Sequence, residues 1–285
     1  IPAVSGVQAK DQDRVETVTY RKDAQKAIIR YVSTNGNRVL TTDEVTGKSG
    51  EAIAYSTTSQ ITEFKKQGYK LVSDEFTAGG AKVYDYDTAR DQVYTVTLSE
   101  RVEPVNPDNP TPQPNTPVNP GQPDSPRWPG TVENLDNKES VSRTIHYVYE
   151  DGSKAKDDVV ETLNFKRWSN VNLVTGHIDF QDWTTNDDTF DKVVSPTIAG
   201  YTADKSEIPA VSGVQAKDQD RVETVTYHKD AQKAVIRYVS TNGNQVLKTD
   251  EVTGKSGEAI AYSTTSQITE FKKQGYKLVS DEFTA

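Results

Sequence analysis

The chain has 285 residues, a formal net charge of −9 and a hydrophobic content of 33%. This length predicts about two domains, and the low apolar content fits small domains with thin cores better than one large enzyme core. The negative charge argues against nucleic-acid binding, which depends on stripes of Lys and Arg. The absence of cysteine excludes disulfides, thiolate metal sites and thiol catalysis. With no apolar run of about 18 residues, no membrane insertion is expected.

One stretch of the chain occurs twice. Residues 1–78 recur as residues 208–285 at a constant offset of 207, and four of the 78 aligned positions differ. The differing pairs are Arg21/His228, Ile28/Val235, Arg38/Gln245 and Thr41/Lys248. A period of 207 residues is too long for one turn of a solenoid and predicts an array of whole domains.

Residues 1–22 are predicted to be the C-terminal strand region of a preceding domain. The run from Val15 to Tyr20 is rich in β-branched residues and recurs as residues 222–227, where it closes a predicted domain. The same run is therefore expected to be a strand in both places.

Residues 23–102 are predicted to form one compact domain that begins with a hairpin. Ala27 to Val32 reads as a strand, and a second strand runs from Val39 to Val45. Between them, Asn35-Gly36 is a strong hairpin signal because both residues tolerate positive φ.

A helix and a second pair of strands complete this domain. Thr57 is placed to cap the helix with Gln60 closing a capping box, and Gly68 is placed to end it. Ile61 and Phe64 would share its buried face. Strands at residues 69–72 and 93–98 give the order ββ–α–ββ, which predicts an α+β, β-grasp (ubiquitin-like) domain with the helix covering a mixed sheet.

Residues 103–137 are predicted to be a Pro-rich linker. Nine of the 13 prolines lie within residues 104–126, which contain no aromatic residue and no Lys or Arg. Such a segment favours extended polyproline II and would span about 70 Å at roughly 3.1 Å per residue. The fold class is therefore tandem, strand-rich β-grasp domains in an elongated and monomeric array.

Residues 138–229 are predicted to form a second domain. Alternation at residues 144–149, an Asp151-Gly152 turn and a return strand at residues 159–165 indicate a hairpin. A further hairpin is expected around Thr175-Gly176, and a helical turn near residues 190–194. Residues 230–285 repeat the first domain but lack a counterpart of the strand at 93–98, so this copy is expected to be truncated with an open sheet edge.

The motifs of both domains resemble a known family. The run from Tyr31 to Glu51, followed by Gly68-Tyr69-Lys70-Leu71-Val72-Ser73-Asp74, is similar to the MucBP module of bacterial mucus-binding proteins. The pattern from Trp168 through Leu173-Val174-Thr175-Gly176 to Gly200-Tyr201 resembles the first domain of the Mub repeats of lactic-acid bacteria.

This resemblance implies an extracellular, wall-anchored adhesin of a Gram-positive bacterium, with the anchor outside this chain. It also implies binding to mucin glycoproteins through their glycans, made multivalent by repetition. Some Mub repeats bind immunoglobulins, so light-chain binding is an alternative, and a non-binding stalk is another. The family offers no sharply defined binding motif that could be transferred residue by residue.

Residue patterns for catalysis, cofactors and metals are weak. Gly47-Lys48-Ser49 lacks the first glycine and the following helix of a phosphate-binding loop. The three histidines are far apart, and Arg replaces His228 in the other copy. Asp85 with Asp87, and Asp187 with Asp188, do not match the spacing of a calcium loop. No enzyme activity, cofactor or metal site is therefore expected.

Aromatic side chains are the most plausible binding groups. Sugar rings present apolar C–H faces that pack on aromatic rings, and aromatic residues dominate protein-binding hot spots. Trp168 and Trp183 lie in polar stretches and, with Tyr149, are the candidate ligand-binding residues, although most aromatics of small domains belong to the core. Pairing of a partner with an exposed strand edge is the alternative, because it would leave no side-chain signature.

Overall fold

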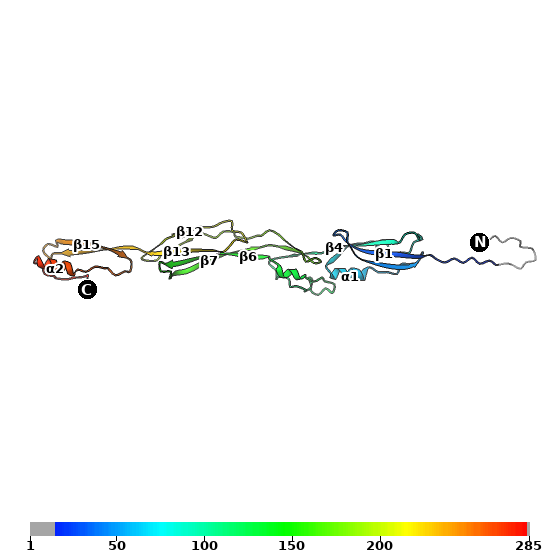
Figure 1. Ribbon diagram of the computed structural model, residues 1–285, viewed down its shortest axis with the longest axis horizontal. Helices are drawn as coiled ribbons and strands as arrows, with labels where there is room; N and C mark the ends of the chain where they lie inside the picture. The colour runs from blue at the N-terminus through cyan, green and yellow to red at the C-terminus, as the bar shows by residue number, and fades with distance from the viewer. Residues whose placement is uncertain (1–14, 284–285) are drawn as a thin grey trace, which may run out of the picture. The chain divides into compact units, whose positions relative to one another are not determined.

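The computed structural model describes residues 15–283, which fall into two compact units (Figure 1). The first comprises residues up to 137 together with 167–182, and the second comprises 138–166 together with residues from 183 onward. Most of the predicted strand region at 1–22 lies outside the described residues. Residues 15–23 are described and are not in a strand.

A four-stranded sheet forms the centre of the first unit. Its strands are β1 (Ala24–Ser33), β2 (Val39–Lys48), β3 (Tyr69–Asp74) and β4 (Gln92–Glu100), arranged in the order β2-β1-β4-β3. The central pair β1–β4 is parallel, and the two outer pairs are antiparallel. The predicted order of two strands, one helix and two strands is confirmed, as is the mixed sheet.

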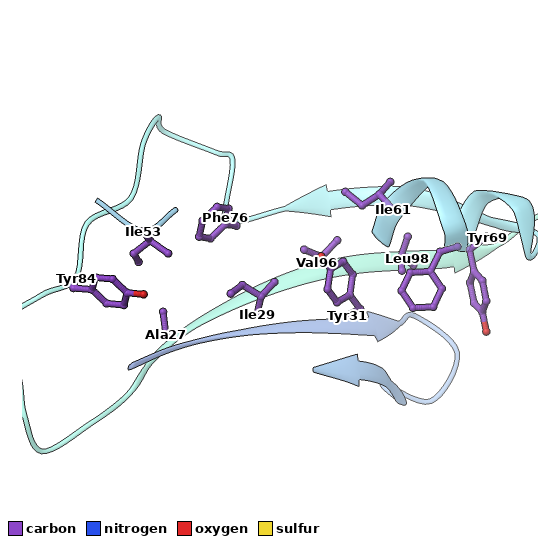
Figure 2. Packing of buried hydrophobic residues seen from close by; sticks show 11 residues of the cluster. Ala27, Ile29, Tyr31, Ile53, Ile61, Tyr69, Phe76, Tyr84, Val96 and Leu98 are labelled. Carbon is purple, nitrogen blue, oxygen red and sulfur yellow. The ribbon is translucent and has the colours of Figure 1, made fainter. Parts of the chain in front are cut away.

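Helix α1 (Thr58–Lys66) covers one face of this sheet (Figure 2). Ile61 and Phe64 are its buried residues, as their spacing predicts. They pack on alternate residues of the two central strands, which are fully buried: Ala27, Ile29, Tyr31, Val96 and Leu98. The period of two along the strands and the i, i+3 pair on the helix together define this core.

The predicted capping box at the start of α1 is wrong. Thr57 is the N-cap residue but makes no side-chain bond to the helix backbone. Its hydroxyl instead donates to Asp74 Oδ2 at 2.6 Å, which ties the start of the helix to the end of β3. The Thr57 hydroxyl, which the local sequence predicts to cap the helix, therefore bonds a side chain from another part of the fold.

The end of α1 follows the prediction. Gly68 has φ +94°, the left-handed conformation expected of a glycine after a helix. It also makes a close approach, because a Cβ at this position would lie 2.9 Å from the backbone carbonyl carbon of Leu173. Its equivalent in the second copy, Gly275, has φ +87° and nothing within 4 Å of such a Cβ.

We expect Gly68→Ala to destabilise the first unit more than Gly275→Ala destabilises the second. Both substitutions place alanine in the left-handed region, at a cost of about 1–2 kcal/mol. Only Gly68→Ala also forces the backbone of Leu173 to move. Hydrogen exchange of β3 and β4 measures the first effect, and exchange of the helix α2 (Thr265–Lys273) measures the second. Equal losses of protection would show that the contact with Leu173 contributes nothing.

The predicted hairpin between β1 and β2 is confirmed, but its turn differs in detail. The positive φ values fall on Gly36 (+69°) and Asn37 (+52°), one residue later than Asn35-Gly36 predicts. Asn35 instead uses its backbone N–H to bond Ser33 Oγ at 3.1 Å. The loop is longer than a two-residue turn, which shifts the left-handed positions.

A three-stranded sheet completes the first unit. It consists of β5 (Val102–Val105), β8 (Ser169–Asn172) and β9 (Ile178–Phe180), all antiparallel. The hairpin predicted around Thr175-Gly176 is thus present. Its first strand, β8, pairs with β5, which follows the four-stranded sheet in sequence. A 3₁₀ helix, η1 (Gly130–Asn134), lies beside it, and buried Val105, Val132, Val171 and Leu173 form the local core.

The extended spacer predicted for residues 104–126 is wrong. The segment folds back on itself: Asn115 N–H donates to the Trp128 carbonyl at 2.9 Å, and Val118 N–H donates to the Pro126 carbonyl at 2.9 Å. Val118 and Trp128 pack against the core around Val132. Apolar residues just outside the Pro-rich stretch supply the core that its own composition lacks.

The second unit is built on another four-stranded sheet. Its strands are β6 (Lys138–Tyr149), β7 (Lys154–Lys166), β11 (Tyr201–Ala203) and β13 (Arg221–Lys229), in the order β11-β13-β6-β7. The central pair β6–β13 is parallel. The hairpin predicted between β6 and β7 is confirmed, with Gly152 at φ +80° in its turn.

Short segments cover one face of this sheet. Strands β10 (Val193–Val194) and β12 (Glu207–Ile208) pair with each other, and Ile208 packs on Ile145, Tyr147, Val225 and Tyr227. The helical turn predicted near residues 190–194 is wrong, because Phe190 bridges Val211 and the following valines form β10. Too few residues lie between these contacts for helical periodicity to distinguish a turn from a strand.

The repeated stretch ends the second unit. Strands β14 (Ala231–Val239) and β15 (Val246–Lys255) pair in the same register as β1 and β2, and α2 (Thr265–Lys273) matches α1. Within the described residues these strands form a sheet of two, and α2 buries none of its side chains. Nearly identical sequence thus gives the same local structure with a much more exposed core.

A chain of hydrogen bonds recurs in both copies. The Tyr31 and Tyr55 hydroxyls are 2.9 Å apart, and Tyr55 donates to Asp43. In the second copy the same distance separates Tyr238 from Tyr262, which donates to Asp250 Oδ2 at 2.5 Å. Burial, followed by the bond to Asp43, raises the pKa of Tyr55, and the bond to Asp250 is the main cause that raises the pKa of Tyr262.

We expect the folded chain to lose stability steeply above about pH 10, where an unperturbed tyrosine ionises. Burial raises the pKa of Tyr31, Tyr55, Tyr147 and Tyr227 in the folded state. A raised tyrosine pKa favours folding at every pH below the unfolded value, and the contribution is lost as pH rises beyond it. Tyrosinate absorbance should therefore rise together with the loss of circular dichroism. Titration of all tyrosines before any unfolding would contradict this.

Candidate functional site

A shallow cavity lies at one end of the β6–β7 hairpin. Its volume is about 250 Å³, and it is lined by Lys138, Glu139, Asn164, Phe165, Lys166, Thr185 and Asn186. The segment around Thr185 reaches this place because Lys166 and Thr184 exchange backbone hydrogen bonds of 2.9 and 2.8 Å. Thr185 adds a side-chain bond of 2.8 Å to the Asn164 carbonyl. The lining combines amide, hydroxyl, carboxylate and ammonium groups with one ring.

Trp183 lies next to this cavity. It is half-buried and packs against the cluster formed by Val141, Leu163, Phe165, Phe190, Val214 and Ala216. The Lys217 ammonium sits 5.5 Å from its ring centroid and is also ion-paired with Glu139 of the cavity lining. The predicted binding residue Trp183 is thus partly a core residue, held beside a polar hollow.

The other two predicted residues lie elsewhere. Trp168 belongs to the first unit and is 42% exposed, and its carbonyl accepts a bond from Gln181 N–H at 2.9 Å. Tyr149 is half-buried, with its ring centroid 4.8 Å from that of Tyr201. It packs on the cluster around Ile145, which differs from the cluster around Phe165. Within the second unit, Trp183 and Tyr149 therefore pack on different clusters, and Trp168 belongs to the other unit.

A buried arginine fixes the shape of the second unit close to this cavity. Arg143 on β6 is 1% exposed, and its Nε donates to Glu161 Oε2 of β7 at 2.7 Å. Nη1 donates to the Pro209 carbonyl at 3.0 Å, and Nη2 donates to Glu161 and to the Asp191 carbonyl. Its guanidinium also lies 5.2 Å from the Phe190 ring centroid. One side chain thereby joins β6, β7 and the two segments that flank β10 and β12.

Local structure explains the acidic pairs and the histidines. Asp85 Oδ1 accepts from Asp87 N–H, and Asp87 Oδ1 accepts from Ala89 N–H, as in solvated turns. His146 faces Asp158 at 3.0 Å and His228 faces Glu150 at 2.7 Å, each on the surface. Within residues 15–283, no group of three or more His, Cys, Asp or Glu side chains is placed to hold a metal ion.

Sequence reasoning missed most residues of the cavity. Glu139, Asn164 and Asn186 carry no motif, and up to 47 positions of sequence separate them. Their proximity follows from the pairing of β6 with β7 and from the return of residues 184–186. The bulky Trp183 in a polar stretch was the one signal that could indicate this region.

Comparisons with known proteins agree with the architecture. The family model described as a mucin binding domain matches residues 25–100 and 232–285, and the Muc B2-like domain matches residues 132–231. The chain is similar to the crystal structure of Mub-RV, with 26% identity and a TM-score of 0.57, covering 72% of this chain and 99% of that one.

It is also similar to a MucBP domain of an adhesion protein from Pediococcus pentosaceus, with 36% identity and a TM-score of 0.29, covering 32% of this chain and 98% of that one. A type 2 repeat of the mucus binding protein MUB from Lactobacillus reuteri shows 28% identity and a TM-score of 0.47, covering 72% of this chain and 100% of that one. No curated protein sequence matches the chain.

The fold and the matching domains define a class: strand-rich adhesin domains, which are binding modules and not an enzyme family. Within it, the chain belongs to the family of Mub repeats and MucBP domains. Mub and MucBP domains belong to bacterial surface adhesins, which indicates an extracellular location. None of the helices in residues 15–283 is long and apolar enough to cross a membrane.

Proposed function

We propose that this chain is part of a cell-wall-anchored adhesin that binds host mucin glycans through several weak, repeated contacts. The observation that carries the proposal is the double match to the mucin binding domain, at residues 25–100 and 232–285. Repetition on one chain raises the effective concentration of each module near its ligand, so weak single sites give useful avidity.

The module boundaries in this proposal are 23–102, 138–229 and 230–285, preceded by the segment 1–22 and joined by the segment 103–137. We assign the first and third modules to the β-grasp class, supported by the order β2-β1-β4-β3 and by α1 against one face. The second module resembles the first in its parallel central pair.

We place the glycan site at the cavity beside Trp183. Hydroxyl groups of sugars bond well to the amides and the hydroxyl that line it, namely Asn164, Asn186 and Thr185. The neighbouring Trp183 offers part of a ring on which the C–H face of a sugar can pack. Trp168 and Tyr149 remain separate candidates on other parts of the surface.

The test measures binding of the whole chain to purified mucin, before and after enzymatic removal of glycans, and to immunoglobulin light chains. Glycan-dependent binding supports the proposal. Light-chain binding alone would favour the immunoglobulin alternative, and no binding to any of these would favour a structural stalk.

The site is tested by the pair Asn164→Ala and Asn186→Ala, with Asn242→Ala in the β14–β15 loop as the matched control. We expect the cavity pair to weaken mucin binding about tenfold, because each lost hydrogen bond costs about 0.5–1.5 kcal/mol. The control should leave binding unchanged. Unchanged binding by the cavity pair, with mucin binding otherwise intact, would move the site away from this cavity.

A further inference from the structure

The first and last strands of each of two modules are parallel neighbours. In the first, β1 pairs with β4 from Ala27–Gln92 to Ser33–Leu98. In the second, β6 pairs with β13 from Arg143–Arg221 to Tyr149–Tyr227. Each ladder contains seven residue pairs. The chain therefore enters and leaves each module through strands that are hydrogen-bonded to each other.

This pairing determines how tension acts on a module. In a parallel pair, the start of the first strand and the end of the last strand lie at opposite ends of the ladder. Pulling the chain at both ends slides one strand along the other, so all backbone hydrogen bonds of the ladder bear the force together. Pulling the two ends of an antiparallel hairpin apart would instead break its bonds one after another.

The position of both ladders strengthens this effect. They occupy the centre of sheets ordered β2-β1-β4-β3 and β11-β13-β6-β7, so each strand of the pair is also bonded to an outer strand. One face of each ladder is buried: Ile29, Val96, Ile145 and Val225 are all fully inaccessible to solvent. Water therefore cannot readily replace the ladder bonds from that side.

We propose that the β1–β4 and β6–β13 pairs are mechanical clamps, which keep these modules folded while the chain is under tension. Forced unfolding depends on the unfolding rate, and a ladder that must break as a unit makes that rate low. This load-bearing role is separate from ligand binding and holds whether or not any module binds mucin. It fits a chain that would connect a cell to a surface in flowing fluid.

Single-molecule force spectroscopy on the whole chain tests the clamp by changing only the direction of pulling. The chain contains no cysteine, so pairs of introduced cysteines can serve as unique attachment points. Ala24→Cys with Val102→Cys loads the β1–β4 ladder in shear. Ala24→Cys with Lys48→Cys peels the β1–β2 hairpin, because Ala24 and Lys48 are directly paired across its open end. All three positions are exposed.

We expect the shear pair to unfold the module at a force about twofold or more above that of the peeling pair. Circular dichroism of both variants before attachment confirms that they fold alike, so that direction alone differs. Equal forces in the two geometries, or a higher force for peeling, would overturn the proposal.

Pulling the unmodified chain by its termini provides a second readout. The first module spans 77 residues from Ala24 to Glu100, and the second spans 92 residues from Lys138 to Lys229. At up to about 3.6 Å per residue, less the folded span, one high-force event should lengthen the chain by roughly 24 nm and the other by at most about 29 nm. The second length is shorter if residues 167–182, which belong to the first unit, stay paired with β5. Release of these lengths at forces no higher than those of the peeled hairpin would also overturn the proposal.

Discussion

Replacement of Arg143 by methionine should destabilise the second unit by about 3–5 kcal/mol, a large part of the typical 5–15 kcal/mol stability of a domain. The substitution leaves the Glu161 carboxylate without its ion partner and removes the donors to the carbonyls of Pro209 and Asp191. Denaturant unfolding, together with hydrogen exchange of β6 and β13, measures the effect.

Arg221→Met is the matched control for this prediction. Arg221 stands directly opposite Arg143 on β13 but is exposed, so its loss should change stability by no more than about 0.5 kcal/mol. The double variant Arg143→Met/Glu161→Gln should recover part of the loss, because no unpaired charge then remains. Similar midpoints for Arg143→Met and Arg221→Met would show that the buried guanidinium network does not stabilise the fold.

Phe64→Ala should cost the first unit about 3–5 kcal/mol, the usual cost of removing a buried phenylalanine ring. Phe64 is 5% exposed and lies between Tyr31 and Tyr69, with ring centroids 5.6 and 5.7 Å away. The cavity left behind would be enclosed by the sheet and α1. Hydrogen exchange measures the effect, and we expect β1 and β4 to lose protection.

The chain contains its own control, because Phe271 occupies the same position in the second copy. It keeps the ring contacts, at 5.5 Å to Tyr238 and 5.8 Å to Tyr276, but it is only half-buried. Folding removes less apolar area of Phe271 than of Phe64 from water. Phe271→Ala should therefore lower the free energy of unfolding by clearly less than Phe64→Ala does. Equal losses of hydrogen-exchange protection in the two variants would show that burial does not determine how much this phenylalanine stabilises the fold.

Local patterns predicted the strand-rich architecture well. The alternation at residues 144–149, the Ile61–Phe64 pair and Gly68 each correspond to one periodicity or one backbone conformation, which neighbouring residues determine. Sequence reasoning failed where a distant group competes with a local one. Thr57, for example, bonds Asp74 instead of the helix. The shift of the left-handed residues from Asn35-Gly36 to Gly36-Asn37 has a local cause, the longer loop between β1 and β2.

The Pro-rich segment shows a different limit. Its composition indicates a chain that cannot form a core by itself. Yet Val132 and Val171 lie outside the segment and belong to the apolar cluster on which Val118 and Trp128 pack. Composition describes only the segment, whereas folding also depends on what the rest of the chain places next to it.

The candidate site was the least predictable feature. Trp183 was identified because a large ring in a polar stretch stands out, but its half-buried packing depends on β6, β7 and the segment around Val214. The cavity residues Asn164 and Asn186 are ordinary surface types, and their convergence follows from strand register. No periodicity within a single sequence window contains that information.

The near-identity of β1 and β14 has a consequence for how the chain folds. The two strands differ at one aligned position, Ile28 against Val235, so β4 meets two almost equivalent partners. Closing β1 onto β4 spans about 60 residues, and closing β14 onto β4 spans about 130, a difference worth only about 0.6 kcal/mol in loop entropy. Loop entropy therefore favours the correct pair only slightly, whereas synthesis from the N-terminus favours it further, because β1 and β4 are complete before β14 is made.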